Sequence, residues 1–381
     1  MKKFDLFVPT KVYFGNKIYK EALKKEKNTL QGKVLLVTTG RSLHRLGYVA
    51  NIVDVLHEIK EVTHVEIFDQ VSANPKLTEI QQGIETGIKK KASVVVGLGG
   101  GSALDAAKAI AVGIGTAQPI EDFLFHGQIP SEKTLPIIAI PTTSGTGSEL
   151  SKGAIITSLE KQIKTGIRGE HIYPKAAIVD PSFTIHIPYI TTMETGFDVF
   201  AHAVESYISK EATPFSDLLS EQVIHIVSTA LLRLTQNLSD SEAREQMSYA
   251  SMLMGMNLGN VGTALPHRLQ YPIGAHTDTT HSAGLVSLYP AWVTYGYQYS
   301  ASKFNKIATI LSGHLCSSKD EVLQSFTTFI NQLAIGKNLR QLGISDAEIE
   351  GLASQVTGNI SNDPAAEESD IIRKIYTMAM N

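Results

Sequence analysis

The sequence predicts an α/β domain in the first half of the chain and an all-helical domain in the second half. The first 180 residues alternate short apolar, β-branched runs with helical patterns, whereas the remainder has long helical patterns and few convincing strands. The length of 381 residues suits about two domains. The break is expected in residues 180–189, where two prolines interrupt the periodicity. We therefore predict domains at residues 1–181 and 182–381.

Five apolar runs are the predicted strands of the first domain. They cover residues 34–38, 65–68, 93–97, 135–140 and 177–179. Because these runs are continuously apolar and alternate with helical patterns such as residues 102–113, they indicate a parallel sheet covered on both faces. The clearest helices of the second domain are predicted at residues 218–236 and 241–257.

Composition excludes several classes of protein. Acidic residues outnumber basic ones 37 to 34, and no basic block exists, so nucleic acid is not an expected partner. The single cysteine, Cys316, excludes an internal disulfide and a cysteine-rich zinc site. The chain lacks an apolar signal-peptide run at its start and any apolar stretch of 18 residues, so a cytoplasmic protein without a membrane partner is expected.

A glycine-rich turn, Gly97-Leu98-Gly99-Gly100-Gly101-Ser102, follows the third predicted strand and opens a helix. Glycines allow the backbone to approach a ligand closely, and free N–H groups at a helix start attract phosphate. Asp105, one turn into the helix, could contact a ribose or a nicotinamide. The turn has neither the G-x-G-x-x-G spacing nor the Walker lysine, and a tight turn that binds nothing is the alternative.

A second polar loop, residues 141–149 (PTTSGTGSE), follows the fourth predicted strand. Its hydroxyls and glycines suit a loop that wraps a polar ligand, although a plain Ser/Thr/Gly-rich connection has the same composition. Both loops stand at the carboxyl ends of strands, where open parallel sheets bind nucleotides.

Four residues of the second half form a candidate metal site. Asp198 and His202 are four apart in a helical pattern, so their side chains share one face. Such a pair is often a surface interaction, but its neighbours here are apolar. His267 and His281 follow later in the chain, and either could be an ordinary core or surface histidine that binds no metal. One carboxylate and three imidazoles suit Fe²⁺ or Zn²⁺ with a position left for substrate.

Four long motifs occur in order along the chain. They are GGGSALDAAKAIA at 99–111, IPTTSGTGSELS at 140–151, TGFDVFAHAVESYIS at 195–209, and PHRLQYPIGAHTDTTHSAGLVSLYPAW at 266–292. With these motifs the chain resembles the iron-containing (group III) alcohol dehydrogenases of the dehydroquinate synthase-like superfamily. Its THSAGLVSLYPAW segment is most similar to the butanol dehydrogenase and aldehyde reductase branch. The resemblance implies a Rossmann-like N-terminal domain, an all-helical C-terminal domain and an active site in the cleft between them.

The resemblance also implies roles for individual residues and a homodimer, which is common in the family. The implied metal ligands are Asp198, His202, His267 and His281. The implied pyrophosphate loop is Gly99, Gly100, Gly101 and Ser102. The further implied cofactor contacts are Asp105, Thr142, Thr143, Thr146 and Lys164.

The sequence departs from the family pattern in two places. Members that prefer NAD often have an aspartate just after the first of the predicted strands, but here the turn is Thr39-Gly40-Arg41-Ser42. An aspartate would repel a 2′-phosphate, whereas this turn could bind one through charge-assisted bonds, so NADP(H) is favoured over NAD(H). Many members of the family have a histidine four residues after the third metal ligand, but here that residue is Tyr271. Tyr271 or His276 would therefore have to act as the proton relay.

The activity implied is hydride transfer between NAD(P)(H) and a small alcohol/aldehyde pair, with Fe²⁺ or Zn²⁺ as Lewis acid. One alternative is a non-redox lyase of the same superfamily that uses NAD and a metal. A second is a glycerol dehydrogenase-like zinc enzyme, and a third is a binding module without catalysis.

Overall fold

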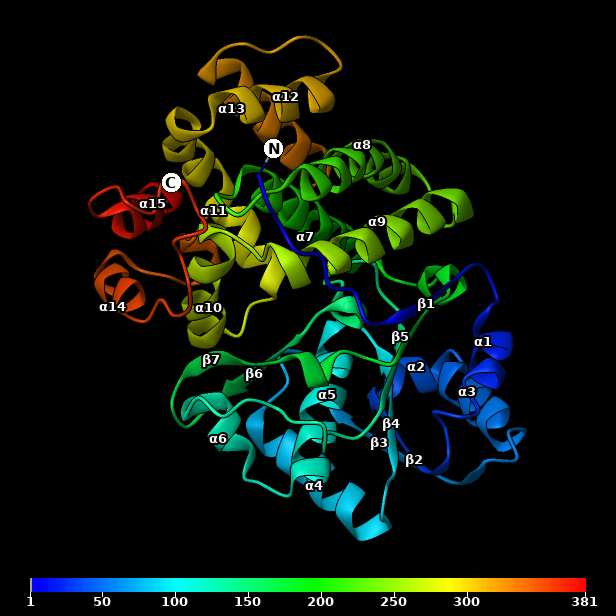
Figure 1. Cartoon of the computed structure of the whole chain (residues 1–381). Coiled ribbons are helices and arrows are strands. Elements are labelled where there is room, and N and C mark those ends of the chain that lie inside the picture. Colours follow the sequence, from blue (N-terminus) through cyan, green and yellow to red (C-terminus); the bar gives the residue numbers. More distant parts are fainter. Residues whose placement is uncertain (1) are drawn as a thin grey trace. The chain divides into compact units, whose positions relative to one another are not determined.

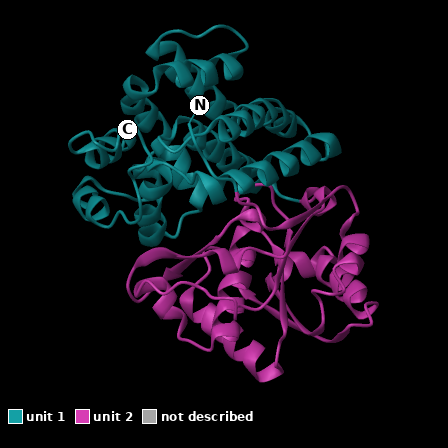
Figure 2. Ribbon diagram, in the orientation of Figure 1, with its two compact units in different colours: residues 1–6, 187–381 teal, residues 7–186 magenta. Residues whose placement is uncertain are grey.

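The computed structural model describes residues 2–381, which divide into two compact units (Figure 2). The sheet unit is Phe7–His186, and the helical unit is Ile187–Asn381 together with residues 2–6. The division follows His186 and therefore falls inside the segment 180–189 that was expected to separate the domains.

The sheet unit is built on a six-stranded sheet with the order β1-β8-β5-β4-β2-β3, and every neighbouring pair is parallel. The strands are β1 (Lys11–Phe14), β2 (Gly32–Thr39), β3 (Val62–Val71), β4 (Val94–Gly99), β5 (Ile137–Pro141) and β8 (Ala176–Val179). The predicted parallel sheet is confirmed, and each predicted run overlaps one of these strands. The short edge strand β1 was not predicted, because it contains no buried residue.

Helices cover both faces of this sheet. They are α1 (Tyr19–Lys25), α2 (Arg41–Arg45), α3 (Tyr48–His57), α4 (Leu77–Lys90), α5 (Gly101–Thr116) and α6 (Ile120–Phe125). Val34 and Leu36 of β2 belong to one buried cluster with side chains of α1 and α3, whereas Leu35 and Val37 belong to another with side chains of α4 and α5. These helix pairs lie on opposite sides of the strands in Figure 1. Burial on both faces explains why the strands are continuously apolar.

The strand order reverses between β2 and β4. The chain runs from β2 to its neighbour β3, and then returns to form β4 on the other side of β2. Such a reversal at the carboxyl ends of parallel strands opens a crevice, which is where open α/β sheets bind ligands. The first glycine-rich loop leaves β4 at this point, and the turn Thr39–Ser42 leaves β2 beside it.

The sheet unit also contains an antiparallel hairpin that the sequence did not predict. Strands β6 (Gly153–Ser158) and β7 (Ile163–Arg168) form a separate two-stranded sheet, and Thr157 of β6 also makes an isolated parallel bridge with Lys76. The hairpin follows the second polar loop directly, so it fixes where that loop ends.

The helical unit confirms the predicted all-helical half. Its helices are α7 (Tyr189–Ile208), α8 (Pro214–Gln236), α9 (Ser241–Asn260), α10 (Leu265–Thr277), α11 (His281–Gly296), α12 (Ala301–Ser312), α13 (Lys319–Gln332), α14 (Ile349–Ser354) and α15 (Ile371–Ala379). Aromatic rings fill the space between α7, α11 and α13: Phe200 lies 4.9 Å from Phe329 and 6.3 Å from Tyr289 between ring centroids. This packing holds α7 rigidly, and α7 positions part of the candidate site.

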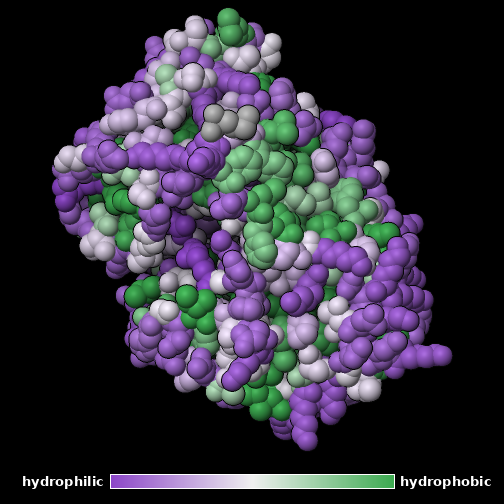
Figure 3. Space-filling view, viewed as in Figure 1, coloured by the Kyte–Doolittle hydropathy of each residue, from purple (hydrophilic) through white to green (hydrophobic). Residues whose placement is uncertain are grey.

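Polar and charged residues occupy much of the face in Figure 3, interrupted by apolar patches. Among residues 2–381, no helix has both the length and the apolar character needed to cross a bilayer.

Candidate metal centre and cofactor loops

Helix α7 positions Asp198 and His202 one turn apart. Both side chains are buried, with 2% and 4% of the residue surface exposed. Their neighbours Phe197, Val199 and Phe200 are fully buried in the helical unit. The Asp–His pair therefore faces the interior of this unit and is not a surface interaction.

Helices α10 and α11 position the other two histidines. His267 lies in the first turn of α10, and His281 is the first residue of α11. The connection turns sharply because Asp278 adopts a left-handed conformation (φ 52°), and the Thr280 hydroxyl then caps α11 by accepting from the N–H of Ala283. This turn brings two histidines that are 14 positions apart to one place.

The three imidazoles converge on a single carboxylate oxygen of Asp198. The Nε2 atoms of His267, His281 and His202 lie 3.4, 3.6 and 3.8 Å from Asp198 Oδ1. Ligand atoms of Asp198, His267 and His281 all lie within 4.8 Å of one another, and the His202 ring stacks on His267 with 4.4 Å between centroids. The structure therefore brings Asp198, His267 and His281 together as one candidate metal-binding group, with the fourth predicted ligand, His202, directly beside it.

Two atoms of this cluster are buried without a hydrogen-bond partner, Asp198 Oδ1 and His267 Nε2. Buried polar atoms are nearly always paired, and an unpaired carboxylate oxygen is especially costly. A cation between these atoms would satisfy both. The donor set, one carboxylate oxygen and three imidazole nitrogens, fits Fe²⁺ or Zn²⁺.

Electrostatics in the cluster favour a bound positive charge. Burial raises the pKa of Asp198, but His202, His281 and His267 outweigh it and hold that pKa well below its usual range. Burial lowers the pKa of His267, yet Glu205 and Asp198 together raise it to about 10. Both shifts favour positive charge in the cluster, which is the charge that a bound metal ion would supply.

A further acidic residue of α7, Glu205, supports the cluster. The sequence analysis did not identify it. Glu205 is fully buried and accepts a hydrogen bond from His267 Nδ1 at 2.7 Å. Burial, with Glu205 next in effect, raises the pKa of Tyr289 well above its usual value, so the Tyr289 hydroxyl keeps its proton. That proton lies between two acceptors, Ala201 O at 3.1 Å and Glu205 Oε1 at 3.3 Å. The available signal was spacing, because Glu205 stands seven residues after Asp198 on the same helix face.

The two candidate relay residues lie in different surroundings. The Tyr271 ring is 6.2 Å from the His281 ring between centroids. His276, by contrast, is bonded through Nε2 to Glu348 Oε1 at 2.6 Å in an exposed contact. Of the two, Tyr271 is the one placed beside a candidate metal ligand.

The two polar loops of the sheet unit touch each other. The Thr142 N–H donates to Gly99 O at 2.9 Å. A Cβ on Gly100 would lie 3.0 Å from Thr143 Oγ1, and one on Gly101 would lie 2.5 Å from Thr146 Cγ2. Only glycine allows this close approach, and Gly99 also needs its positive φ of 152°. Gly99–Ser102 and the three threonines thus form one surface at the start of α5.

Two other predicted cofactor contacts are bonded within the protein. Asp105 accepts from the Ser148 hydroxyl at 2.5 Å and from the Ile155 N–H at 2.9 Å. Lys164 Nζ donates to Asn74 Oδ1 at 2.9 Å. Asp105 therefore connects helix α5 to the end of the second polar loop through hydrogen bonds within the protein.

Lys108, which the sequence analysis also missed, ties the same loop more firmly. It is fully buried, and its Nζ lies 2.8–3.1 Å from Ser148 Oγ, Ser151 O, Ser151 Oγ and Gly153 O. Burial lowers its pKa to about 8 against the opposing charges of Asp105 and Glu149. The signal in the sequence was a lone lysine in an alanine-rich, otherwise apolar helix.

The turn after β2 lies beside the first glycine loop. Thr39 Oγ1 is 3.8 Å from the position of a Cβ on Gly99, and Arg41 is exposed at the start of α2. An acidic side chain of the neighbouring strand, Asp69, is paired with His44 at 3.0 Å. The turn therefore presents the Arg41 side chain to solvent.

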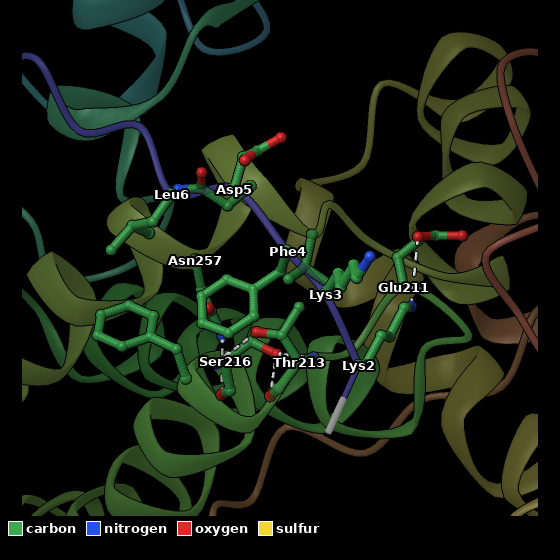
Figure 4. A pocket seen from close by; sticks show the side chains of 12 residues that line it. Lys2, Lys3, Phe4, Asp5, Leu6, Glu211, Thr213, Ser216 and Asn257 are labelled. Atoms are coloured by element: carbon green, nitrogen blue, oxygen red, sulfur yellow. Dashed lines mark hydrogen bonds and ion pairs between the residues drawn. The ribbon is translucent and has the colours of Figure 1, made fainter.

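A separate cavity of about 160 Å³ lies in the helical unit, between residues 2–6 and the ends of α8 and α9 (Figure 4). Phe4, Ser216 and Asn257 are among the residues that line it, and Lys2 pairs with Glu211 at 3.5 Å. None of the predicted site residues lines this cavity.

The sequence matches known protein families over nearly its whole length. Residues 9–181 match the family model described as iron-containing alcohol dehydrogenase, and residues 192–380 match the Fe-containing alcohol dehydrogenase family, C-terminal. The chain belongs to the iron-containing alcohol dehydrogenase family. The resemblance stated from the motifs is therefore confirmed.

Relatives within the family are similar over their full lengths. The 1,3-propanediol dehydrogenase of Klebsiella pneumoniae is 30% identical, with 99% of each chain covered. The NADH-dependent butanol dehydrogenase A of Clostridium acetobutylicum is also 30% identical, with 94% of each chain covered. The crystal structure of NADH-dependent butanol dehydrogenase A from Thermotoga maritima has a TM-score of 0.90 at 27% identity and covers 100% of this chain and 99% of its own.

As an iron-containing alcohol dehydrogenase, the protein is a metal-dependent oxidoreductase that acts on alcohols or aldehydes. The predicted oxidoreductase activity is thus supported over the non-redox lyase. The family also implies a metal and a nicotinamide dinucleotide, which agrees with the two candidate sites described above.

Proposed function

We propose that this iron-containing alcohol dehydrogenase transfers a hydride between NADP(H) and a small alcohol/aldehyde pair, using Fe²⁺ or Zn²⁺ held by Asp198, His202, His267 and His281. The observation that supports this most strongly is the convergence of three imidazole Nε2 atoms on the buried Asp198 Oδ1, which has no hydrogen-bond partner. A bound metal supplies a Lewis acid that polarises a carbonyl or lowers the pKa of an alcohol.

The residues of the chain supply position and orientation. The buried aromatic packing of α7 fixes Asp198 and His202, and the turn at Asp278 fixes His281. In the sheet unit, Gly99–Ser102 offer backbone N–H groups to a pyrophosphate, and Thr142, Thr143 and Thr146 line the same surface. Lys164 and Asp105 complete the proposed cofactor contacts. In an enzyme that uses a cofactor, the protein's own contribution includes positioning of this kind.

The direct test is loss of absorbance at the NADPH band with a panel of small aldehydes, with and without added Fe²⁺ or Zn²⁺. We expect consumption of NADPH that depends on the aldehyde and is abolished by a chelator. Tightly bound NAD without net consumption would instead indicate the lyase, and no response to any aldehyde would leave a binding module.

The preference for NADP(H) is proposed from the turn Thr39–Ser42. No acid stands at residue 39 to bond ribose hydroxyls, and the exposed Arg41 can bond a 2′-phosphate. Several relatives have NAD or NADH in their names, so this preference would distinguish the chain from them.

The substitution Arg41→Ala should weaken the binding of NADPH but not that of NADH. Loss of a charge-assisted hydrogen bond costs about 1.5–3 kcal/mol, so KM for NADPH should rise roughly 10- to 150-fold while KM for NADH stays the same. The matched control is Arg45→Ala, which removes an exposed arginine from the same helix. An equal effect on both cofactors, or a control that behaves like Arg41→Ala, would refute the proposed phosphate contact.

The metal is proposed as iron or zinc because the donor set suits both. The homodimer expected from the resemblance stays a prediction, which sedimentation of the purified chain would check.

A further inference from the structure

Glu205 lies behind the candidate metal centre and is bonded to it through one imidazole. Its Oε1 accepts from His267 Nδ1 at 2.7 Å and from the Tyr289 hydroxyl at 3.3 Å. Its Oε2 accepts from the N–H of Ala264 at 2.8 Å, immediately before α10 begins. With no surface exposed, Glu205 links α7 both to the start of α10 and to the His267 ring on that helix.

The carboxylate decides which nitrogen of His267 has the proton. An ionised carboxylate only accepts hydrogen bonds, so the proton of the neutral imidazole has to stay on Nδ1. In this neutral form, which is the one that binds a metal, the Nε2 lone pair faces Asp198 Oδ1, and Nε2 is buried without a hydrogen-bond partner in the protein. An anion bonded to the far side of a ligating imidazole also makes it a stronger donor to the metal.

His281 is oriented in a different way. Its Nδ1 is bonded to the amide oxygen of Gln270 at 2.5 Å. A Cβ on Gly284 would lie 2.6 Å from Gln270 Cγ, and one on Gly274 would lie 2.8 Å from Gln270 Nε2, so the amide is held tightly between two glycines. The support of His281 is thus neutral, whereas that of His267 is a buried carboxylate.

We infer that Glu205 is a positioning residue that sets the tautomer and orientation of His267 for metal binding. This inference rests on the proposed function, because it requires a metal on the Asp198 cluster. It goes beyond that function by assigning the strength of metal binding to a residue that contacts neither metal nor substrate.

Glu205→Gln tests this with almost no change in volume. The Ala264 N–H still needs an acceptor, so the single amide oxygen is expected to face it and the amide NH₂ to face His267 Nδ1. Nδ1 then has to accept, which leaves the proton on Nε2 and removes the lone pair that would bind the metal. We expect the zinc dissociation constant, measured by competition with a chromophoric chelator, to rise about 10- to 100-fold.

Asp363→Asn is the matched control. Asp363 is also buried beside the start of α10, where Oδ2 accepts from the Leu265 N–H at 3.1 Å and from Trp292 Nε1 at 2.8 Å, but no bond joins it to a candidate ligand. Both variants should lower the melting temperature of the metal-free protein. Only Glu205→Gln should weaken zinc binding and shift the visible absorption bands of the Co²⁺-loaded protein.

The possible outcomes separate the inference from the function on which it rests. Native affinity in Glu205→Gln, or equal losses of affinity in the two variants, would overturn the role of Glu205 while leaving the metal site intact. Failure of the native chain to bind either zinc or cobalt would overturn the metal site and the inference together.

Discussion

His267→Ala should abolish metal binding and turnover together. His267 Nε2 lies 3.4 Å from Asp198 Oδ1, and both atoms are buried without a hydrogen-bond partner. Removing a ligand should weaken metal binding by more than the roughly 100-fold expected for a residue that only supports a ligand. Since a Lewis acid stabilises the transition state by several kcal/mol, kcat should fall by about three orders of magnitude.

Bound metal per chain and NADPH consumption with an active aldehyde are the two measurements. His225→Ala is the matched control, because it removes an exposed imidazole from helix α8, which contributes no candidate ligand. Near-normal turnover in His267→Ala would contradict the assignment, and so would loss of turnover with full metal content.

Lys108→Met should destabilise the sheet unit and weaken cofactor binding. The substitution removes a buried ammonium that lies within hydrogen-bonding distance of four oxygens in residues 148–153. It also leaves Asp105 and the buried Glu149, whose pKa burial raises to about 7, without their neighbouring cation. Breaking such an arrangement costs about 3–5 kcal/mol, which corresponds to a melting temperature lower by roughly 10 °C.

The affinity for the cofactor should fall as well. Lys108 holds residues 148–153, and these directly follow the threonine loop that packs against the first glycine-rich turn. Thermal unfolding and fluorescence titration with NADPH measure the two effects. Lys152→Met is the control, since Lys152 lies in the same segment but is exposed. A variant with native stability and native NADPH affinity would show that Lys108 does not hold this loop.

Much of the fold was predictable from local patterns. A parallel sheet buried on both faces needs continuously apolar strands, and those runs identified β2, β3, β4, β5 and β8. Strand β1 and the hairpin β6–β7 were missed. No residue of β1 is buried, and in β6 and β7 buried residues are interspersed with partly buried ones, so these strands lack the continuous burial of the central strands.

Within the candidate site, the sequence by itself determined which residues have the right chemistry. Helix spacing placed Asp198 and His202 on one face, and the glycines at 99–101 predicted a turn that needs close backbone approach. These conclusions depend on residues near each other in the chain, where helix periodicity and backbone sterics apply directly.

The tertiary structure alone decided what surrounds those residues. It brought His267 and His281 to Asp198 through the turn at Asp278, and it placed Glu205 behind His267. It also buried Lys108 against a loop some 40 positions away. No periodic pattern encodes such contacts, because they depend on how separate helices pack, and packing fixes which buried charge finds which partner.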